Sequence, residues 1–216
     1  HTSADLDYQT TTALTGTIKD LAGNDAVLTL SAPGAANAGS LAANAAVVVD
    51  GVRPEVTSVT STTNNGSYNH VDDGGGDNVI VITVTFDDVV HINGTPTLEL
   101  ETGAADASVS YASGSGGATL TFNYTISTGH ASSDLDYTGT GALAVAGSAW
   151  IRDVNSTDGN TATLTLPEPG EDGSLGKNKD LKIDTTPPNV TCESCGVTSS
   201  IDNGHYNDVD DGSADN

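Results

Sequence analysis

Basic residues are scarce in this chain of 216 residues, which has six Lys and Arg against 29 Asp and Glu and a formal net charge of −23. Nucleic acids and anionic membrane surfaces bind clusters of Lys and Arg, so neither is an expected partner. No apolar run approaches the ~20 residues that span a bilayer, and we expect no membrane insertion. Methionine and a recognisable signal peptide are both missing, so we expect the chain to be a window on a longer protein.

Cysteine and catalytic motifs are equally scarce. The two cysteines, Cys192 and Cys195, form a lone C-x-x-C, which is at best half of a zinc site. We expect a local disulfide between them, with two free thiols or a partner outside the chain as alternatives. Nucleophile elbows, Walker loops, H-E-x-x-H and dinucleotide fingerprints are absent from the sequence. Glu99 and Glu101 could suggest glycoside cleavage, but solvated positions on an edge strand explain them better, so we expect no enzyme.

What the chain has is self-similarity, because residues 1–78 return as residues 130–216. HTSADLDYQTTTAL matches HASSDLDYTGTGAL, and GSYNHVDDGGGDN matches GHYNDVDDGSADN. A period of roughly 130 residues fits one domain per repeat. We therefore expect a complete domain at 51–184, the last strands of a preceding repeat in 1–50, and the first strand and loop of a following repeat in 185–216. Neither partial repeat should hold a core alone, so each should borrow strands from a neighbouring molecule or belong to a continuous fibre.

Alternation of apolar and polar residues predicts strands throughout the complete repeat. The segments concerned are VIVITVTF, PTLELET, ASVSYA, ATLTFNYTI, TATLTL and LKID. Period-two patterns rich in Val, Ile, Thr and aromatic residues, broken by Gly, Asn, Asp and Ser, are typical of half-buried antiparallel strands. About seven or eight such strands predict an all-β fold, an immunoglobulin-like β-sandwich. Prolines at the joints VVVDGVRPEV and KIDTTPPNV predict short, stiff connections between domains.

Acidic residues recur in the loops at both poles of this predicted sandwich. One pole would gather the A–B loop, the E–F loop and the exit linker, and the other the B–C and F–G loops beside Asp50. Calcium takes six to eight oxygen ligands and would offset the repulsion between these carboxylates. A single Asp is better explained as a turn residue, whereas the repeated DLDY and DDGxxDN motifs favour calcium. The candidate ligands are Asp50, Asp72, Asp73, Asp77, Asp87, Asp88, Asp134, Asp136, Asp153, Asp184, Asp208, Asp210, Asp211 and Asp215.

Several segments together resemble a bacterial immunoglobulin-like repeat of large secreted surface proteins and adhesins. They are IDTTPP, FDDVVHINGTPTLELETG, YASGSGGATLTFNYT, SSDLDY, IRDVNSTDGNTATLTLP and GSLGKNK. Such repeats are similar to cadherin domains in being joined by calcium at the linkers. The resemblance implies linker ligands at Asp50 and Asp184 and B–C ligands at Asp87 and Asp88. It also implies E–F ligands at Asp5, Asp7, Asp134 and Asp136, and F–G ligands at Asp20 and Asp153.

Aromatic residues and histidines receive structural interpretations. Tyr8 and Tyr137 end the two DLDY motifs, and we expect each hydroxyl to bond to the backbone, as a corner tyrosine does. Trp150 is the single tryptophan and is expected to be a partly buried packing residue, with sugar stacking as the alternative. The five histidines are scattered without metal spacing and are expected at the surface.

These features predict a structural segment of a long extracellular tandem-repeat protein, secreted or at the cell surface, that calcium makes rigid at the junctions between domains. Its partners would be neighbouring repeats of the same chain or identical chains. One alternative is a module that binds a carbohydrate or a surface through Trp150 and the insertion at 149–160. Another is a subunit that polymerises by exchanging strands, and a third is an accessory domain of a secreted hydrolase.

Overall fold

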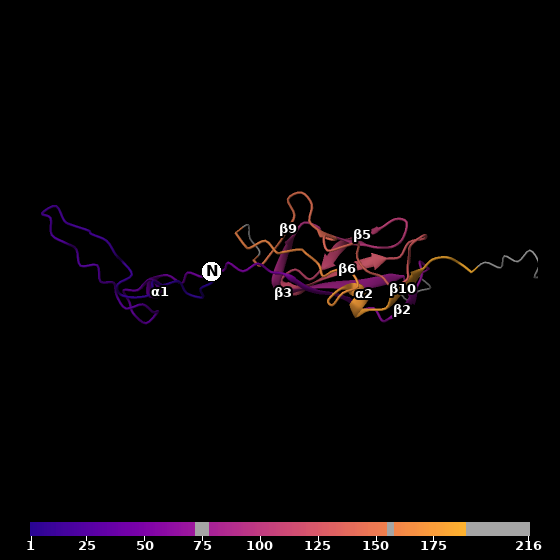
Figure 1. Cartoon of the computed structure of the whole chain (residues 1–216), viewed down its shortest axis with the longest axis horizontal. Helices are drawn as coiled ribbons and strands as arrows, with labels where there is room; N and C mark the ends of the chain where they lie inside the picture. The colour runs from indigo at the N-terminus through magenta and orange to yellow at the C-terminus, as the bar shows by residue number, and fades with distance from the viewer. Residues whose placement is uncertain (72–77, 155–157, 189–216) are drawn as a thin grey trace, which may run out of the picture. The chain divides into compact units, whose positions relative to one another are not determined.

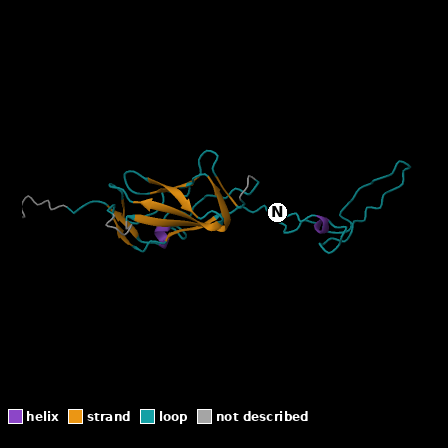
Figure 2. Cartoon of the chain, turned by 180° about the vertical axis from the view of Figure 1, so that it is seen from behind, coloured by secondary structure: helices purple, strands orange, loops and turns teal. Residues whose placement is uncertain are grey.

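The computed structural model describes residues 1–71, 78–154 and 158–188. Residues His1–Thr185 form one unit, and Thr186 begins a second. Strands dominate the described part of the chain (Figures 1 and 2). They are β1 Val56–Ser61, β2 Gly66–Tyr68, β3 Val79–Asn93, β4 Thr97–Leu100, β5 Ala107–Ser113, β6 Gly117–Thr125, β7 Ala131–Ser132, β8 Leu143–Ala144, β9 Trp150–Arg152 and β10 Leu181–Asp184. Two short helices, α1 Leu41–Asn44 and α2 Leu175–Asn178, complete the elements. The predicted all-β class is confirmed for these residues.

The strands form a curled seven-stranded sheet and a smaller three-stranded one. The first has the order β1-β3-β6-β5-β4-β8, with β9 paired to β3, and its ladders are antiparallel. The second has the order β2-β10-β7. Within it β10 runs parallel to β2 and antiparallel to β7. The immunoglobulin-like arrangement of these sheets stays a prediction.

Strand β3 links the two ends of the 51–185 region. Its first half alternates buried and half-buried residues and pairs with β6 from Val79 to Thr85. The register then shifts before Val90, and the last residues of β3 pair with β9 instead. We call the end that holds β9 the entrance end, because Pro54 precedes β1 there, and the end where β10 stops at Asp184 the exit end (Figure 1).

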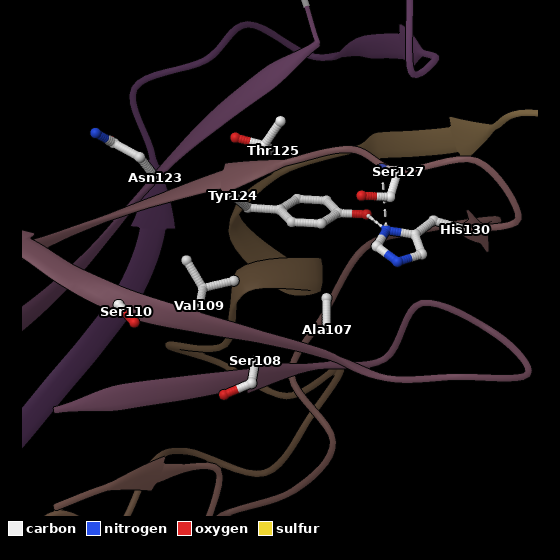
Figure 3. A pocket seen from close by; sticks show the side chains of 9 residues that line it. All are labelled: Ala107, Ser108, Val109, Ser110, Asn123, Tyr124, Thr125, Ser127 and His130. Carbon is white, nitrogen blue, oxygen red and sulfur yellow. Dashed lines mark hydrogen bonds between the residues drawn. The ribbon is translucent and has the colours of Figure 1, made fainter.

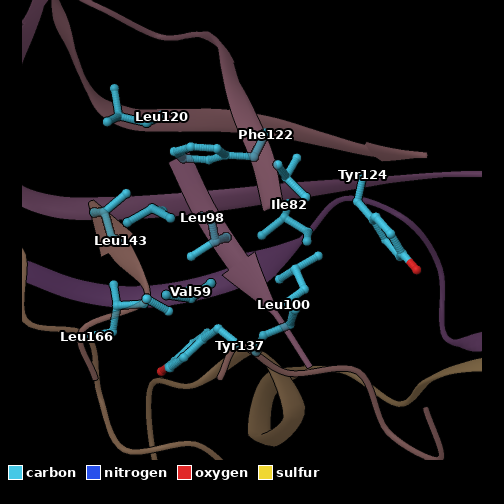
Figure 4. Close-up of a cluster of buried hydrophobic side chains, with 14 of the residues drawn as sticks. Val59, Ile82, Leu98, Leu100, Leu120, Phe122, Tyr124, Tyr137, Leu143 and Leu166 are labelled. Carbon is cyan, nitrogen blue, oxygen red and sulfur yellow. The ribbon is translucent and has the colours of Figure 1, made fainter. Parts of the chain in front are cut away.

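The core contains residues of both sheets, at the alternating positions that the sequence predicts. Ile80, Ile82 and Val84 of β3 are fully buried, and so are Leu120 and Phe122 of β6. Figure 4 shows Ile82, Leu120 and Phe122 in one cluster with side chains from β1, β4 and the segment after β7. Complete burial of one such side chain stabilises a fold by about 1.5–3 kcal/mol. The buried apolar side chains that form the core belong to positions 59–183, and none of them belongs to residues 1–50.

The segment TATLTL differs from its prediction as a regular strand. Residues 161–166 form only isolated bridges, in which Thr161 meets Arg152 and Thr163 runs parallel to Glu55. Their alternation is nevertheless used, since Ala162 and Leu166 are buried. The backbone of Leu166 donates to the carbonyl of Thr140 instead of joining a continuous ladder. Apolar alternation therefore predicted the buried face correctly, but it did not determine which backbone partners were within reach.

Candidate junction site at the entrance end

The loop Asp153–Asn160 lies next to the linker residue Asp50. Asp153 Oδ1 accepts from the Asn160 backbone N–H at 2.8 Å, and Asp153 Oδ2 accepts from Asn160 Nδ2 at 2.7 Å. The same Nδ2 donates to the carbonyl of Asp50 at 3.1 Å. Asp50 in turn closes its own turn by accepting from the Val52 N–H at 3.0 Å. One amide group therefore joins the F–G loop to the linker, which are two of the predicted ligand positions.

A shallow cavity of about 310 Å³ opens at this contact, and its lining is part polar and part apolar. The lining residues are Val48, Asp50, Asp153, Val154, Asp158, Gly159 and Asn160. Its oxygen atoms are of the carboxylate and carbonyl type that calcium binds. In the described ranges, no three Asp, Glu, His or Cys side chains come close enough together to hold a metal ion. The described side chains therefore do not form a complete metal site by themselves, and calcium at this cavity stays a prediction.

The first copy of the repeat builds the same loop around Asp20. Its Oδ1 accepts from the Asn24 backbone N–H at 2.9 Å and its Oδ2 from Asn24 Nδ2 at 2.9 Å. The side-chain and backbone donors of Asn24 hold the pKa of Asp20 below its ordinary value of 3.8. Next to it, Lys19 forms an exposed ion pair with Asp25. The repeated aspartate thus keeps one geometry in both copies, in which it closes a loop.

The B–C candidates Asp87 and Asp88 lie at the same end of the complete domain. Asp87 Oδ1 accepts from the Glu55 N–H at 2.7 Å, and the Asp87 N–H donates to the Glu55 carbonyl at 3.0 Å. Asp88 accepts from the backbone N–H of its neighbour Val89 at 2.6 Å. Glu55 directly follows Pro54, so the B–C loop is fastened to the chain just after the linker.

The E–F candidates Asp134 and Asp136 follow β7, and the linker candidate Asp184 ends β10. Burial raises the pKa of Asp134, and the nearby charges of Asp180 and Asp136 raise it further. Asp180 directly precedes β10. The gathering of the E–F loop and the exit linker at one pole stays a prediction.

The second aspartate of each DLDY motif binds backbone amides in both copies. Asp136 accepts from the N–H groups of Tyr137 at 3.0 Å and Gly170 at 2.9 Å. Asp7 accepts from the equivalent Tyr8 and Gly34 at 2.9 and 2.8 Å. Burial raises the pKa of Asp7, but the donors Gly34 and Tyr8 outweigh it and leave the pKa lowered. This is a structural role for the motif, and Asp5, its first aspartate, is exposed.

Other candidates fall at the exit end or outside the described residues. Asp184 ends β10, where it pairs with Ala131, and it lines a shallow cavity of about 430 Å³ with Ser67 and Lys182. The remaining predicted positions lie outside the described residues. They are Asp72, Asp73, Asp77, Asp208, Asp210, Asp211 and Asp215, together with Cys192 and Cys195.

The two corner tyrosines bond to the backbone as the sequence predicts. The Tyr137 hydroxyl donates to the carbonyl of Pro167 at 2.5 Å, and the Tyr8 hydroxyl donates to that of Ser31 at 2.7 Å. Pro167 and Ser31 are themselves equivalent positions of the repeat. Burial raises the pKa of both phenols, and the charge of the preceding aspartate raises it further. This prediction is confirmed in both copies.

Sequence reasoning missed a polar cavity of about 370 Å³ between β5 and β6 (Figure 3). Its floor includes Tyr124, whose hydroxyl lies 2.8 Å from His130 Nδ1, with the two rings stacked. The Ser127 N–H donates to the same nitrogen at 3.3 Å, so Nδ1 is an acceptor and Nε2 holds the proton. Burial raises the pKa of Tyr124 to about 12. His130 is therefore half-buried and hydrogen-bonded, whereas the sequence predicted a surface residue. Its recurrence as His1 in the first copy was the sequence signal that could have indicated a structural role.

Trp150 is half-buried in β9, and the Arg152 guanidinium lies 5.1 Å from its ring centroid. The ring is thus covered on one side by a cation, which is consistent with a packing residue.

Comparisons with family models, with curated proteins and with solved structures found no match for this chain. Among the described residues, no helix is long and apolar enough to span a membrane.

Proposed function

We propose that the chain is a structural segment of an extracellular tandem-repeat protein, in which calcium stiffens the junction between neighbouring repeats. The observation that carries the proposal is the contact of Asn160 with both Asp153 and the carbonyl of Asp50. Through it the linker and the F–G loop of the following domain share one cavity. A cation bound there would restrain the linker and fix the angle between repeats.

The charge of the chain supports a cation at this place. The net charge is −23, and two ion pairs, both between exposed groups, are found among the described residues. Asp153 and Asp158 line the cavity together with the linker, and carboxylates that line one cavity repel each other. A bound calcium ion would offset that repulsion. Extracellular modules bind it with dissociation constants on the order of 10⁻⁴–10⁻³ M.

The strand order supports an immunoglobulin-like arrangement within this proposal. The path β1-β3-β6-β5 corresponds to the A-B-E-D sheet of such sandwiches. In the smaller sheet the short strand β2, which follows β1 in the chain, runs parallel to the last strand β10. In this arrangement the exit linker begins where β10 ends, at Asp184, and the equivalent residue of the first copy is Asp50. Each repeat would then contribute one linker carboxylate to the junction that follows it.

Calcium titration of the purified chain by calorimetry tests the proposal, with small-angle scattering in calcium and in chelator as the second measurement. We expect Asp153→Asn to weaken binding at one class of site about tenfold, since the amide removes a charged oxygen. Asp106→Asn is the matched control, because Asp106 is exposed and does not line the cavity. Scattering should give a longer maximum dimension in calcium. Equal binding by the two variants, or equal dimensions in both buffers, would overturn the proposal.

A further inference from the structure

Residues 1–50 reproduce the internal contacts of residues 130–184. The Leu6 N–H donates to the Val47 carbonyl at 2.8 Å, as Leu135 donates to Leu181 at 2.7 Å. Likewise Leu30 donates to Thr11 and Leu166 to Thr140, both at 2.8 Å. These pairs are equivalent positions of the repeat. The two segments therefore have the same local fold, although only residues 130–184 are part of a core.

The short helix repeats as well. Ser40 caps α1 by accepting from the Ala43 N–H, and Ser174 caps α2 by accepting from the Lys177 N–H. After each helix the chain continues in extended form. In the first copy Val49 is bridged to Ser3, and in the second β10 pairs with β7. The first copy thus holds its shape without the strands β1 to β6 that cover the second.

What the first copy lacks is burial of its apolar side chains. Leu6 is 39% exposed, against 0% for its equivalent Leu135. Leu41 is 40% exposed, against 0% for Leu175 in α2. The remaining members of this set follow the same rule. We call Leu6, Leu14, Ile18, Leu41 and Val47 the open face; their equivalents are Leu135, Leu143, Ile151, Leu175 and Leu181, all buried.

The complete domain shows what covers this face. Leu143 pairs with Leu98 of β4, and Ile151 with Ile92 of β3. The Val59 N–H of β1 donates to the carbonyl of Gly173, just before α2, at 2.7 Å. All the covering strands come from residues 51–129. The residues covered and the covering strands are therefore both identified by the repeat.

One asparagine of the repeat has different hydrogen-bond acceptors in the two copies. In the complete domain, Asn178 Nδ2 reaches across to the Val59 carbonyl of β1 at 2.8 Å. In the first copy its equivalent, Asn44, turns back to the carbonyls of Ala38 and Ser40 at 2.9 and 2.6 Å. The same amide group thus uses local acceptors where β1 is not present.

We propose that the open face is a docking surface for one kind of partner, a polypeptide segment with the sequence pattern of residues 51–129, supplied by another repeat. Docking would bury the five apolar side chains and give Asn44 a strand carbonyl to bind. The strands β1, β3 and β4 are the expected partners because they contact the equivalent part of the second copy. This proposal does not rest on calcium, and it is tested in chelator so that the two can fail separately.

The test adds a second copy of residues 51–129 in front of His1 of the full chain, which preserves the native order of Gly129 followed by His130. Amide hydrogen exchange is then measured at Leu6 and Val49. We expect protection to rise by roughly 100-fold or more, toward that of Leu135 and Ile183, because exchange would require opening of a core. Unchanged exchange at Leu6 and Val49 would overturn the proposal.

Two variants of the extended chain complete the test. Leu41→Asp, on the open face, should abolish the gain in protection, whereas Leu21→Asp should keep it, because Leu21 is fully exposed in a loop. An equal effect of both substitutions would count against docking through this face. The added segment has the same sequence as the one that folds against residues 130–184. If it stayed unfolded while residues 51–185 folded normally, that result would also count against docking.

Discussion

At the scale of single residues, the repeated aspartates and tyrosines stabilise loops through hydrogen bonds to the backbone. Asp153 and Asp20 each close a loop onto an asparagine, and Asp136 holds two backbone amides. A carboxylate that accepts such bonds is stabilised in its charged form. These bonds leave some lone pairs of the oxygens unused, so the same side chains remain able to face a cation. Loop closure and cation binding are compatible roles for one aspartate.

The loop of Asp20 gives a prediction about pH. Because the donors of Asn24 lower the folded-state pKa of Asp20, its contribution to stability is present above the ordinary value of 3.8 and is lost as pH falls through the lower folded value. We expect an NMR titration midpoint for Asp20 below 3.8. Asn24→Ala should move the midpoint up toward that value. An identical midpoint in the parent chain and the variant would contradict this.

The corner tyrosine gives a second prediction. Tyr137→Phe should lower the free energy of unfolding of the 51–185 region by about 1–2 kcal/mol, because the half-buried Pro167 carbonyl loses its donor. Tyr8→Phe removes the equivalent bond to Ser31, where no core depends on it. It should leave the main unfolding transition unchanged in chemical denaturation. Equal losses in both variants would show that residues 1–50 unfold together with the core.

At the scale of elements, β3 and α2 organise the complete domain. β3 pairs with β1 and β6 along its first half and with β9 at the entrance end, so one strand positions the loops of both ends. Helix α2 has a single turn and lacks the length for independent stability. It persists because Leu175 is buried and Asn178 is bonded to β1.

The helix caps provide a matched pair of substitutions. Ser174 is buried and accepts from Lys177, so Ser174→Ala should cost about 1 kcal/mol in the unfolding of the complete domain. Ser40→Ala removes the same cap from α1, which is not part of the core, and should leave that transition unchanged. Thermal unfolding followed by circular dichroism compares the two. A loss of similar size from both substitutions would contradict the assignment of the core.

At the scale of the whole molecule, net charge dominates the electrostatics. With a charge of −23, repulsion between carboxylates opposes the folded state and is screened by salt. The melting temperature should therefore rise between low and moderate sodium chloride. Calcium chloride should raise it further than sodium chloride of equal ionic strength, if the junction binds the ion. Equal melting temperatures in calcium chloride and sodium chloride of the same ionic strength would show that screening alone stabilises the chain, and would contradict calcium binding.

The sequence by itself determined the all-β class, the buried alternation of β3 and β6, the repeat, and the corner bonds of both tyrosines. These follow from local periodicity and from residues that act on neighbouring backbone. Only the tertiary structure decided that the charge of Asp180 acts on Asp134. It also decided that His130 stacks on Tyr124 and that residues 161–166 bridge without forming a ladder. The register and length of strands set such distances, and no pattern within a single loop encodes them.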